Sequence, residues 1–332
     1  MASIEDPGHR NRHVSLGSWP TPIEPAPRLA QALGLGPDDL WIKRDDLTGL
    51  AGGGNKIRKL EWTVGATIAD GADTLVTSGA PQSNHARLTA AAGAKLGLKV
   101  ILVFPGSPGS SRSGNLVLDG LLGAQIAWAG DVDEAGLNDT VDAVVEQLRH
   151  EGAHPAPIPF GGSSAIAAQG YIECARELRL QTPDLSTVVV ALGSGATMAG
   201  LVAELGPHAV LGIDTGAMSD PLRAAASFAT DAGGSAITES ELRCRRDVVG
   251  SGYSDLTEPV AAAMSLVART EGIILDPIYT GRAMAGLIAA VEDGDIVAGE
   301  VTTFLHTGGL PGLFGHVPAV DRAESGIAEF AL

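Results

Sequence analysis

Cysteine is scarce in this sequence, and the two that occur, Cys174 and Cys244, lie far apart and form no CxxC pair. This scarcity excludes a disulfide framework and a cysteine-based metal site, so both thiols are expected to be buried. Long apolar runs are absent too, since no stretch reaches the ~18 uninterrupted apolar residues that a membrane helix needs. The N-terminal residues also lack the apolar segment of a secretion signal, and we therefore expect a cytoplasmic protein without a membrane partner.

Basic residues are few. The 332 residues include 22 lysines and arginines against 39 acids, which gives a formal net charge of -17. Such a charge repels polyanions, and no basic run is long enough to follow a nucleic-acid backbone, so nucleic acid is not an expected partner. With 45% hydrophobic residues, a chain of this length favours about two domains.

What the chain does contain is an alternation of short apolar runs, most of them ending in glycine, with Ala- and Leu-rich segments of helical spacing. This alternation predicts an α/β fold whose largely parallel strands are buried on both faces. The loop 105–115 and the Pro-rich segment 154–164 interrupt the pattern, and the second is interpreted as a connection between two α/β lobes. The expected strands lie at 73–79, 99–106, 124–130, 186–193, 209–214 and 301–309.

Glycine-rich turns indicate where a ligand would bind. In an open parallel sheet, ligands lie beyond the carboxyl ends of the strands, where such turns lead into helices. Four segments fit this description: 49–61, 79–87, 193–200 and 306–312. We expect the functional residues among them.

The turn at Gly193 follows a predicted strand, and Ala196 and Thr197 begin the next helix. Successive backbone N–H groups there would form a cradle for a phosphate. A dinucleotide site is the alternative, because Asp214 lies where a ribose-binding acid is expected. Met198, however, occupies the sixth position of the fingerprint, where a small residue allows the helix to pack closely.

Lysine accounts for only five of the basic residues. Two of the five, Lys56 and Lys59, lie three residues apart directly after a glycine run. On a helix they would share one face, which is unfavourable unless an anion lies between them. A lysine beside a second cation can lose its proton and form a Schiff base, as pyridoxal phosphate requires. The alternative is that both lysines solvate an exposed helix start.

The segment 79–87 supplies Gln82, Ser83, Asn84 and His85 where a strand ends and a helix begins. Free N–H groups at a helix start bind anions such as a substrate carboxylate. Ser83 or Asn84 could equally cap the helix, and the two roles are compatible. A serine hydrolase is a poor fit because the sequence has no GxSxG motif.

Together these segments resemble the pyridoxal-phosphate enzymes of the tryptophan synthase β-subunit superfamily, within it the D-cysteine desulfhydrase and 1-aminocyclopropane-1-carboxylate deaminase group. The most specific likeness is GGNKIRKLE (53–61) followed by QSNH (82–85), and it extends through GGSSAIAAQGYIE (161–173), GSGATMAG (193–200), EGIILDPIYTGRAMAGL (271–287) and HTGGLPGLF (306–314). The resemblance implies two open parallel-sheet lobes of fold type II, with the cofactor in the cleft between them. It places residues 1–50 and 165–332 in a large cofactor-binding domain and residues 51–164 in a small α/β domain.

The resemblance also implies which residues would hold pyridoxal phosphate. Lys56 would be the Schiff-base lysine, and Lys59 would contact the phosphate. Asn84 would bind the ring hydroxyl, and Thr280 would face the pyridine nitrogen. The backbone from residue 193 to residue 197 would hold the phosphate, through Gly193, Ser194, Gly195, Ala196 and Thr197.

Further roles concern the substrate, a small amino acid. Tyr253 and Tyr279 would lie near the reacting carbon, where a phenol can relay or hold a proton, and Ser83 is another candidate for proton transfer. A homodimer is implied as well. The implied substrate-binding residues are Gln82, Ser83, Asn84, His85, Thr307 and Gly308.

Position 280 bears on the reaction. The deaminase branch has a glutamate there, whereas the neutral Thr280 stabilises a pyridinium poorly and favours prompt β-elimination. We therefore expect D-cysteine to give pyruvate, sulfide and ammonia. Elimination from cysteate or β-chloroalanine is the first alternative, and deamination of 1-aminocyclopropane-1-carboxylate by ring opening is the next. A dinucleotide-dependent oxidoreductase and a non-catalytic binding protein are the other classes. The sequence departs from the family pattern at Ile57, Pro81, Ala196, Met198, Arg282 and 212–221.

Overall fold

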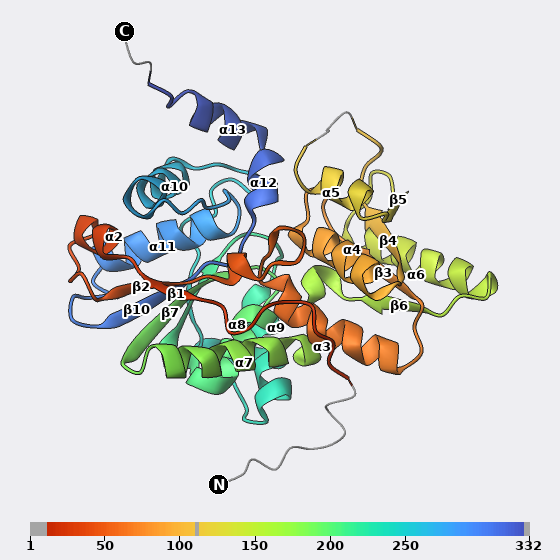
Figure 1. Cartoon of the computed structure of the whole chain (residues 1–332), viewed down its shortest axis with the longest axis horizontal. Coiled ribbons are helices and arrows are strands. Elements are labelled where there is room, and N and C mark those ends of the chain that lie inside the picture. Colours follow the sequence, from red (N-terminus) through yellow and green to blue (C-terminus); the bar gives the residue numbers. More distant parts are fainter. Residues whose placement is uncertain (1–11, 110–112, 329–332) are drawn as a thin grey trace.

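The computed structural model describes residues 12–109 and 113–328. The described chain forms two sheets flanked by helices, one in the left half and one in the right half of Figure 1. The larger sheet has six strands in the order β1-β2-β10-β7-β8-β9, and the smaller has four in the order β5-β4-β3-β6. Every neighbouring pair is parallel except β1 and β2. The predicted α/β fold with two parallel-sheet lobes is confirmed.

All six predicted strands are present. They are β3 (Thr74–Ser78), β4 (Lys99–Phe104), β5 (Gln125–Trp128), β7 (Leu185–Leu192), β8 (Val210–Asp214) and β10 (Val301–Leu305). Four shorter strands were not predicted: β1 (Ile23–Pro25), β2 (Leu40–Lys43), β6 (Pro155–Ile158) and β9 (Arg243–Arg245). The interpretation of 154–164 as a connection is thus partly wrong, because its first half is β6. Its prolines are tolerated because β6 lies at the edge of its sheet.

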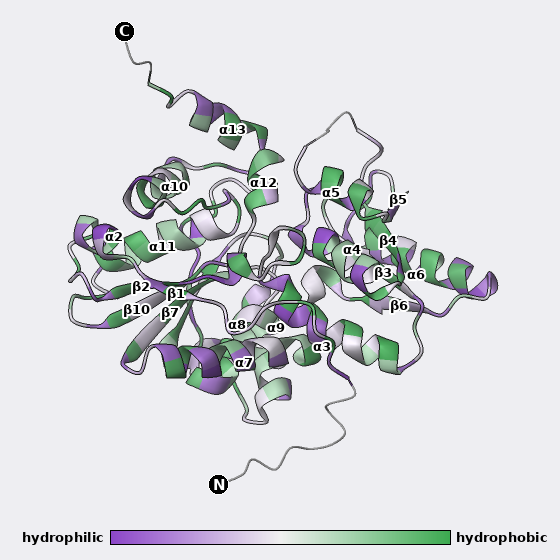
Figure 2. Cartoon of the chain, viewed as in Figure 1, coloured by the Kyte–Doolittle hydropathy of each residue, from purple (hydrophilic) through white to green (hydrophobic). Residues whose placement is uncertain are grey.

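Helices cover both faces of the larger sheet, which explains the continuous apolar run of β7. Val188, Val190 and Leu192 pack with α7 (Ala165–Gln181), α8 (Ala196–Leu205) and α9 (Pro221–Gly233), which lie below the sheet in Figure 1. Val189 and Ala191 point the other way, toward α2 (Pro27–Ala32), α10 (Glu258–Glu271) and α11 (Thr280–Glu292). Alternate residues of a strand face opposite sides, so a strand buried on both faces is apolar throughout. Figure 2 shows these strands as largely hydrophobic.

The smaller sheet packs with α3 (Lys56–Ala69), α4 (Asn84–Leu96) and α5 (Asn115–Leu121) on one face and with α6 (Glu134–His150) on the other. Two short helices, α12 (Leu310–Phe314) and α13 (Val317–Glu324), follow β10. The predicted domain boundaries after residues 50 and 164 fall in connections between the two sheets, and we retain this division as a proposal. Across the described ranges, no helix has the length and apolar character needed to cross a bilayer.

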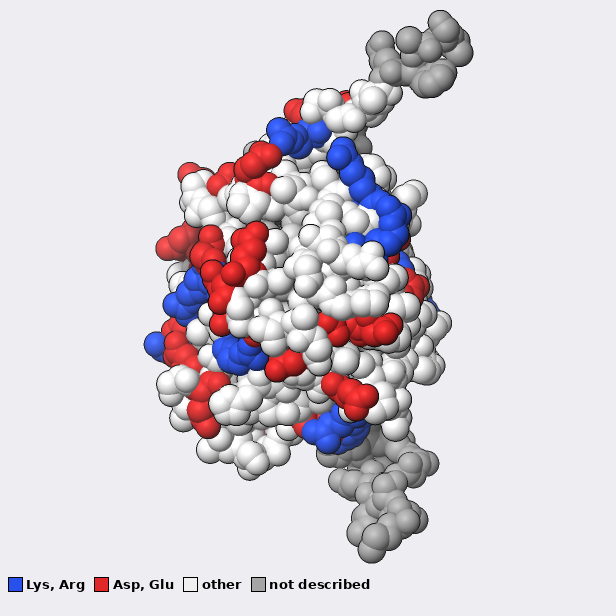
Figure 3. Space-filling model, turned by 90° about the vertical axis from the view of Figure 1, so that its left-hand side faces the viewer, with Lys and Arg blue, Asp and Glu red and all other residues white. Residues whose placement is uncertain are grey.

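The surface reflects the acidic composition. On the face in Figure 3, acidic and basic side chains are interspersed, and the acidic ones predominate. Cys174 is buried and Cys244 is partly buried, and neither forms a disulfide.

Candidate active site

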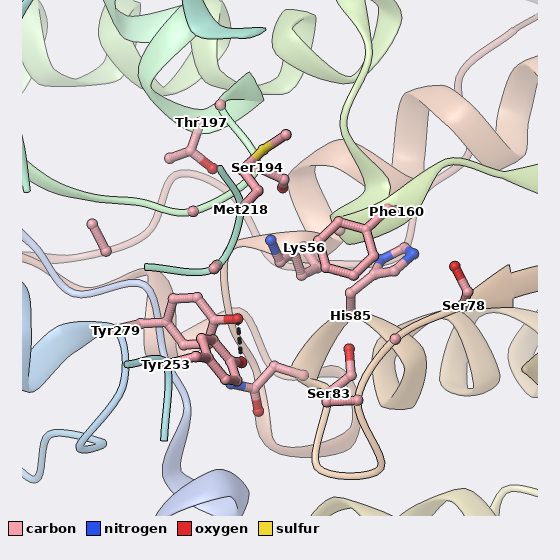
Figure 4. Close-up of a pocket in the computed structure, with 18 of the residues that line it drawn as sticks. Lys56, Ser78, Ser83, His85, Phe160, Ser194, Thr197, Met218, Tyr253 and Tyr279 are labelled. Atoms are coloured by element: carbon pink, nitrogen blue, oxygen red, sulfur yellow. Dashed lines mark hydrogen bonds between the residues drawn. The ribbon is translucent and has the colours of Figure 1, made fainter. Parts of the chain in front are cut away.

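A cavity of about 350 Å³ lies where residues from both sheets and their helices meet. All four predicted segments contribute to its wall, although they are distant in the sequence. They supply Asn55 and Lys56; Gly79, Ala80, Ser83, Asn84 and His85; Gly193, Ser194, Gly195, Thr197 and Met198; and Thr307 and Gly308. Figure 4 shows several of these side chains converging on the cavity.

Lys56 is the first residue of α3, and a tight glycine loop brings it to the cavity. Gly53 has a φ of +70°, and a Cβ atom there would lie 2.0 Å from the carbonyl oxygen of Asp46. The loop is tied to the distant segment 306–312, because the Asn55 backbone N–H donates to the Thr307 carbonyl at 2.9 Å. Only glycine fits a position with a positive φ and such a close approach.

The environment of Lys56 favours the neutral amine. Burial lowers its pKa to about 8, because a charged ammonium is poorly solvated inside the protein. The pKa of Lys59 is also lowered, by burial and by the neighbouring charge of Lys56. A neutral amine is the form that attacks a carbonyl carbon.

The turn at residues 193–197 forms an anion cradle. Gly195 has a φ of +94°, and a Cβ atom there would lie 2.9 Å from the backbone nitrogen of Ala225. The helix α8 begins at Ala196, and the N–H groups of a first turn lack partners within the helix. These groups, with the hydroxyls of Ser194 and Thr197, can bind a phosphate.

Lys59 lies beside this cradle, and a phosphate bound there would favour its charged form, since an anion raises the pKa of a nearby lysine. It is almost fully buried and does not line the cavity, but its Nζ donates to Ser163 Oγ at 2.8 Å. Ser163 Oγ in turn lies 2.6 Å from Ser194 Oγ. A phosphate bound by the turn would therefore have a cation nearby.

Residues 14–308 of this chain match the model of a protein family described as "Pyridoxal-phosphate dependent enzyme". The chain belongs to this family. Its cofactor is pyridoxal phosphate, as predicted.

Relatives narrow the group within the family. A D-cysteine desulfhydrase of Klebsiella pneumoniae is 38% identical over 92% of this chain and 96% of its own length. A protein of Pyrococcus abyssi, described as a candidate 1-aminocyclopropane-1-carboxylate deaminase, is also 38% identical, over 91% and 92% of the two chains. The chain is thus a pyridoxal-phosphate enzyme of the desulfhydrase and deaminase group, and these names leave the substrate open.

Solved structures agree with the fold. The crystal structure of an aminocyclopropane-carboxylate deaminase homologue superimposes with a TM-score of 0.85, at 36% identity, over 94% of this chain and 96% of that one. Threonine deaminase isoform 2 of Solanum lycopersicum superimposes with a TM-score of 0.61 at 18% identity, over 92% and 84% of the two chains. The second comparison bears on the fold alone.

The cavity fits the cofactor of the family. It combines a buried amine with a lowered pKa, a glycine cradle at the start of a helix and the amide of Asn84. The Asn84 Oδ1 atom accepts hydrogen bonds from Asn115 Nδ2 at 3.0 Å and from Arg87 at 3.4 Å. Because the oxygen is engaged, the amide nitrogen is the group that Asn84 can offer to the cofactor ring.

Packing explains why Met198 is compatible with the turn. It is fully buried, and its Sδ atom lies 2.6 Å from the position of a Cβ atom on Gly212. The glycine on β8 therefore makes room for the thioether. The dinucleotide alternative is overturned by the family match, and Asp214 instead accepts a hydrogen bond from the Gly216 N–H at 2.8 Å.

Two residues of the segment 79–87 differ in their structural roles. Ser83 caps α4, since its Oγ accepts from the Ala86 N–H at 3.2 Å, and it also lines the cavity. Gln82 does not line the cavity, because its amide binds the backbone of Ser113 and Asn115 at 3.1 and 2.8 Å. The predicted contact between the Gln82 side chain and the substrate is therefore unsupported.

The role of His85 needs a correction. Thr77 Oγ1 donates its one proton to the Ile158 carbonyl at 2.9 Å, so it must accept at 2.9 Å from His85 Nε2. Nδ1 then carries a lone pair, and burial together with Lys56 and Lys59 lowers the ring pKa well below its usual value. A neutral ring without a free N–H cannot donate to a carboxylate. The predicted substrate contact of His85 stays a prediction, and we propose that the backbone of His85 makes it.

Tyr253 and Tyr279 meet in the cavity, where their hydroxyl oxygens lie 2.7 Å apart (Figure 4). Burial raises both phenol pKa values, so both hydroxyls stay protonated at neutral pH. In such a pair one phenol donates to the other, and the second proton is available to a ligand. The pair can therefore offer a proton to a group beside it in the cavity.

Thr280 is fully buried behind the cavity and does not line it. Its hydroxyl donates to Asp276 Oδ1 at 2.7 Å and accepts from the Asp276 N–H at 2.8 Å. The contact between Thr280 and the pyridine nitrogen stays a prediction. Ala196 likewise contributes backbone and does not line the cavity.

Sequence reasoning missed part of the wall. Phe160 and Gly161 line the cavity and belong to the segment interpreted as a connection, and a Cβ atom on Gly161 would lie 2.2 Å from Ser194 Oγ. The run GGSS after a short strand is the same glycine signal as in the other segments. The remaining wall residues carried no motif; they are Ser78, Pro105, Glu134, Leu137, Asn138, Ala191, Leu192, Ala217 and Met218.

The lowered pKa of Lys56 predicts how the cofactor-free protein captures pyridoxal phosphate. The rate should rise with pH up to about 8 and then level off, because only the neutral amine reacts. Stopped-flow absorbance at pH values from 6 to about 10 measures this rate. A rate that continues to rise above pH 9 would mean an ordinary lysine.

Proposed function

We propose that the enzyme catalyses β-elimination on a small β-substituted amino acid, with D-cysteine as the leading substrate. The observation that carries the proposal is the hydrogen-bonded pair of protonated phenols in the same cavity as a lysine of lowered pKa. Elimination needs a base for the α-proton and benefits from an acid for the leaving group. Lys56 would supply the base and the tyrosine pair the acid, and they belong to different elements of the fold.

Bound pyridoxal phosphate supplies an electron sink for the substrate's α-carbon. Lys56 accepts the α-proton, since its amine is neutral near pH 8. The tyrosine pair gives a proton to the departing sulfur. Ser83, Asn84 and the first N–H groups of α4 hold the substrate carboxylate. After hydrolysis by one water molecule, the products are pyruvate, sulfide and ammonia.

The charges of the cavity favour an uncharged leaving group. Among the described residues of its wall, Lys56 is the one lysine or arginine, and Glu134 adds a negative charge. Cysteate carries a sulfonate as well as a carboxylate and would need a second cation, since a buried anion without a partner is costly. A thiol has no such requirement. Thr280, bound to Asp276, is uncharged and supports elimination over cyclopropane ring opening.

Pyruvate release from a panel of substrates tests the proposal. We expect kcat/KM to be highest for D-cysteine and at least about tenfold lower for cysteate, since one unpaired charge costs a kcal/mol or more. The panel also includes L-cysteine, D-serine, β-chloroalanine and 1-aminocyclopropane-1-carboxylate. Strong activity on the last substrate alone would contradict the proposal.

We propose, from the resemblance, that the protein is a homodimer and that it is cytoplasmic. Sedimentation of the purified protein tests the dimer.

A further inference from the structure

Arg282 is a buried cation that the proposed chemistry does not use, at one of the positions where the sequence departs from the family pattern. It lies on α11, three residues after Tyr279, and its side chain is fully buried. Its Nε atom is buried without a hydrogen-bond partner. Its other donors bind three backbone carbonyl oxygens: that of Thr215, that of Gly252 at 2.8 Å and that of Asp255 at 2.8 Å.

These carbonyls belong to two loops that line the cavity. Gly252 and Asp255 flank Tyr253, and Thr215 precedes Ala217 and Met218 in the wall. The loops also touch each other, because a Cβ atom on Gly216 would lie 2.7 Å from Val249 Cγ1 and 4.0 Å from Tyr253 Cα. Arg282 therefore fastens both loops to the helix that begins beside Tyr279.

Little else holds Tyr253 to α11. Residues 250–256 form neither helix nor strand, and the Asp255 carboxylate is engaged locally, by the Ser251 N–H at 2.9 Å. Tyr253 also meets Tyr279 directly, through the contact of their hydroxyls and an edge-to-face contact of their rings with centroids 6.1 Å apart. A planar guanidinium can reach several carbonyls in fixed directions, whereas a lysine ammonium is a compact charge on a flexible stem.

The charge of Arg282 also reaches the phenols. It lowers both phenol pKa values, although burial and the charge of Asp276 raise them by more. The charged groups that act on the pair are thus Arg282 and Asp276, together with the coupling between the two phenols. A nearby cation stabilises the phenolate that remains after a proton has been given away.

We propose that Arg282 is a positioning residue that holds Tyr253 against Tyr279, so that the pair delivers a proton to the group leaving the β-carbon. This inference rests on the proposed β-elimination. When the Cβ–S bond breaks, sulfur keeps the electron pair, takes a phenol proton and leaves as hydrogen sulfide. Water then returns a proton to the phenolate.

The test compares two leaving groups in Arg282→Met. Chloride leaves as a stable anion without a proton, whereas sulfur benefits from one, and the earlier steps are shared. We expect kcat for D-cysteine to fall by about 10² or more, as for a lost general acid. The kcat for β-chloro-D-alanine should change by less than about threefold, within the range of surface substitutions. KM and the visible absorbance of the bound cofactor should stay close to those of the wild type.

Three further variants complete the test. Tyr253→Phe should show the same leaving-group dependence, and Arg282→Met should add little in that background, because one mutation already disables the pair. Arg282→Lys should recover part of the rate and carries the comparison if the methionine variant does not fold. Arg269→Met, on the exposed face of α10, is the matched control and should leave both rates unchanged.

The outcomes separate the two proposals. Equal losses on both substrates, or additive losses in the double variant, would overturn the role of Arg282. If the wild type ignores D-cysteine but eliminates from D-serine and β-chloroalanine, the choice of D-cysteine is wrong. The same leaving-group comparison then decides on Arg282, since hydroxide also needs a proton. A wild type that eliminates from none of these substrates contradicts both proposals.

Discussion

Lys56→Ala should reduce pyruvate release by at least about 10³-fold, the largest effect we expect from one substitution. The variant removes the one amine among the described residues of the cavity wall, and with it both the covalent attachment of the cofactor and the proposed base. The absorbance of the lysine-bound cofactor at the blue edge of the visible range should disappear. Both quantities are measured on purified protein at a fixed cofactor concentration.

Lys99→Ala is the matched control, because Lys99 is exposed at the start of β4 and does not line the cavity. It should keep the absorbance and the full rate. If Lys56→Ala keeps them too, the assignment of Lys56 is wrong. An exogenous amine should restore some rate to Lys56→Ala if the missing group is a base.

Arg58→Met should lower the free energy of unfolding by about 3–5 kcal/mol, the cost of breaking a buried ion pair on one side. Arg58 binds both carboxylate oxygens of Asp45, at 2.8 and 3.0 Å, and both of Glu177, at 2.9 and 2.8 Å. Arg58 is 2% exposed and Asp45 is fully buried. Burial would raise the pKa of Asp45, but the charge and hydrogen bonds of Arg58, together with the Tyr171 hydrogen bond and the charge of Lys43, outweigh burial and lower the pKa.

Urea unfolding measures this loss of stability. The variant and the wild type are compared at the same saturating cofactor concentration, since ligand binding shifts apparent stability. Arg176→Met is the comparison on α7: the Arg176 side chain is 64% exposed and pairs with Glu204 at 3.1 Å. An exposed pair contributes about 1 kcal/mol or less. Equal losses of stability in the two variants would mean that the carboxylates of Asp45 and Glu177 do not need the charge of Arg58 as a partner. Adding Asp45→Asn to Arg58→Met should recover part of the stability.

The fold could be predicted where strands are long and buried on both faces. Such strands, β7 above all, carry a continuous apolar run, residues 188–192 in β7, and are followed by glycine. The missed strands have three or four residues, and β6 contains two prolines that normally argue against a strand. A short segment carries too little pattern, and its pairing depends on neighbours that are distant in the chain.

The site could be predicted as a set of glycine-rich segments at strand ends, and the structure brings all four to one cavity. The details of the polar side chains could not. Whether Gln82 faces a substrate depends on Asn115, and the protonated nitrogen of His85 depends on Thr77 and, through it, on Ile158. No local pattern encodes such contacts.

The sequence by itself determined the chemistry available to this protein: a glycine-flanked lysine pair, a phosphate-binding turn and hydroxyl and amide groups at the start of a helix. These are local features, since they depend on residue type and on spacing along the chain. Only the tertiary structure decided which polar atoms are still free to act. It engages Gln82 and Thr280, leaves the His85 imidazole without a donor for a ligand, and ties the loop of Tyr253 to Arg282. The physical reason is that each donor or acceptor is used up by partners that folding brings from elsewhere in the chain.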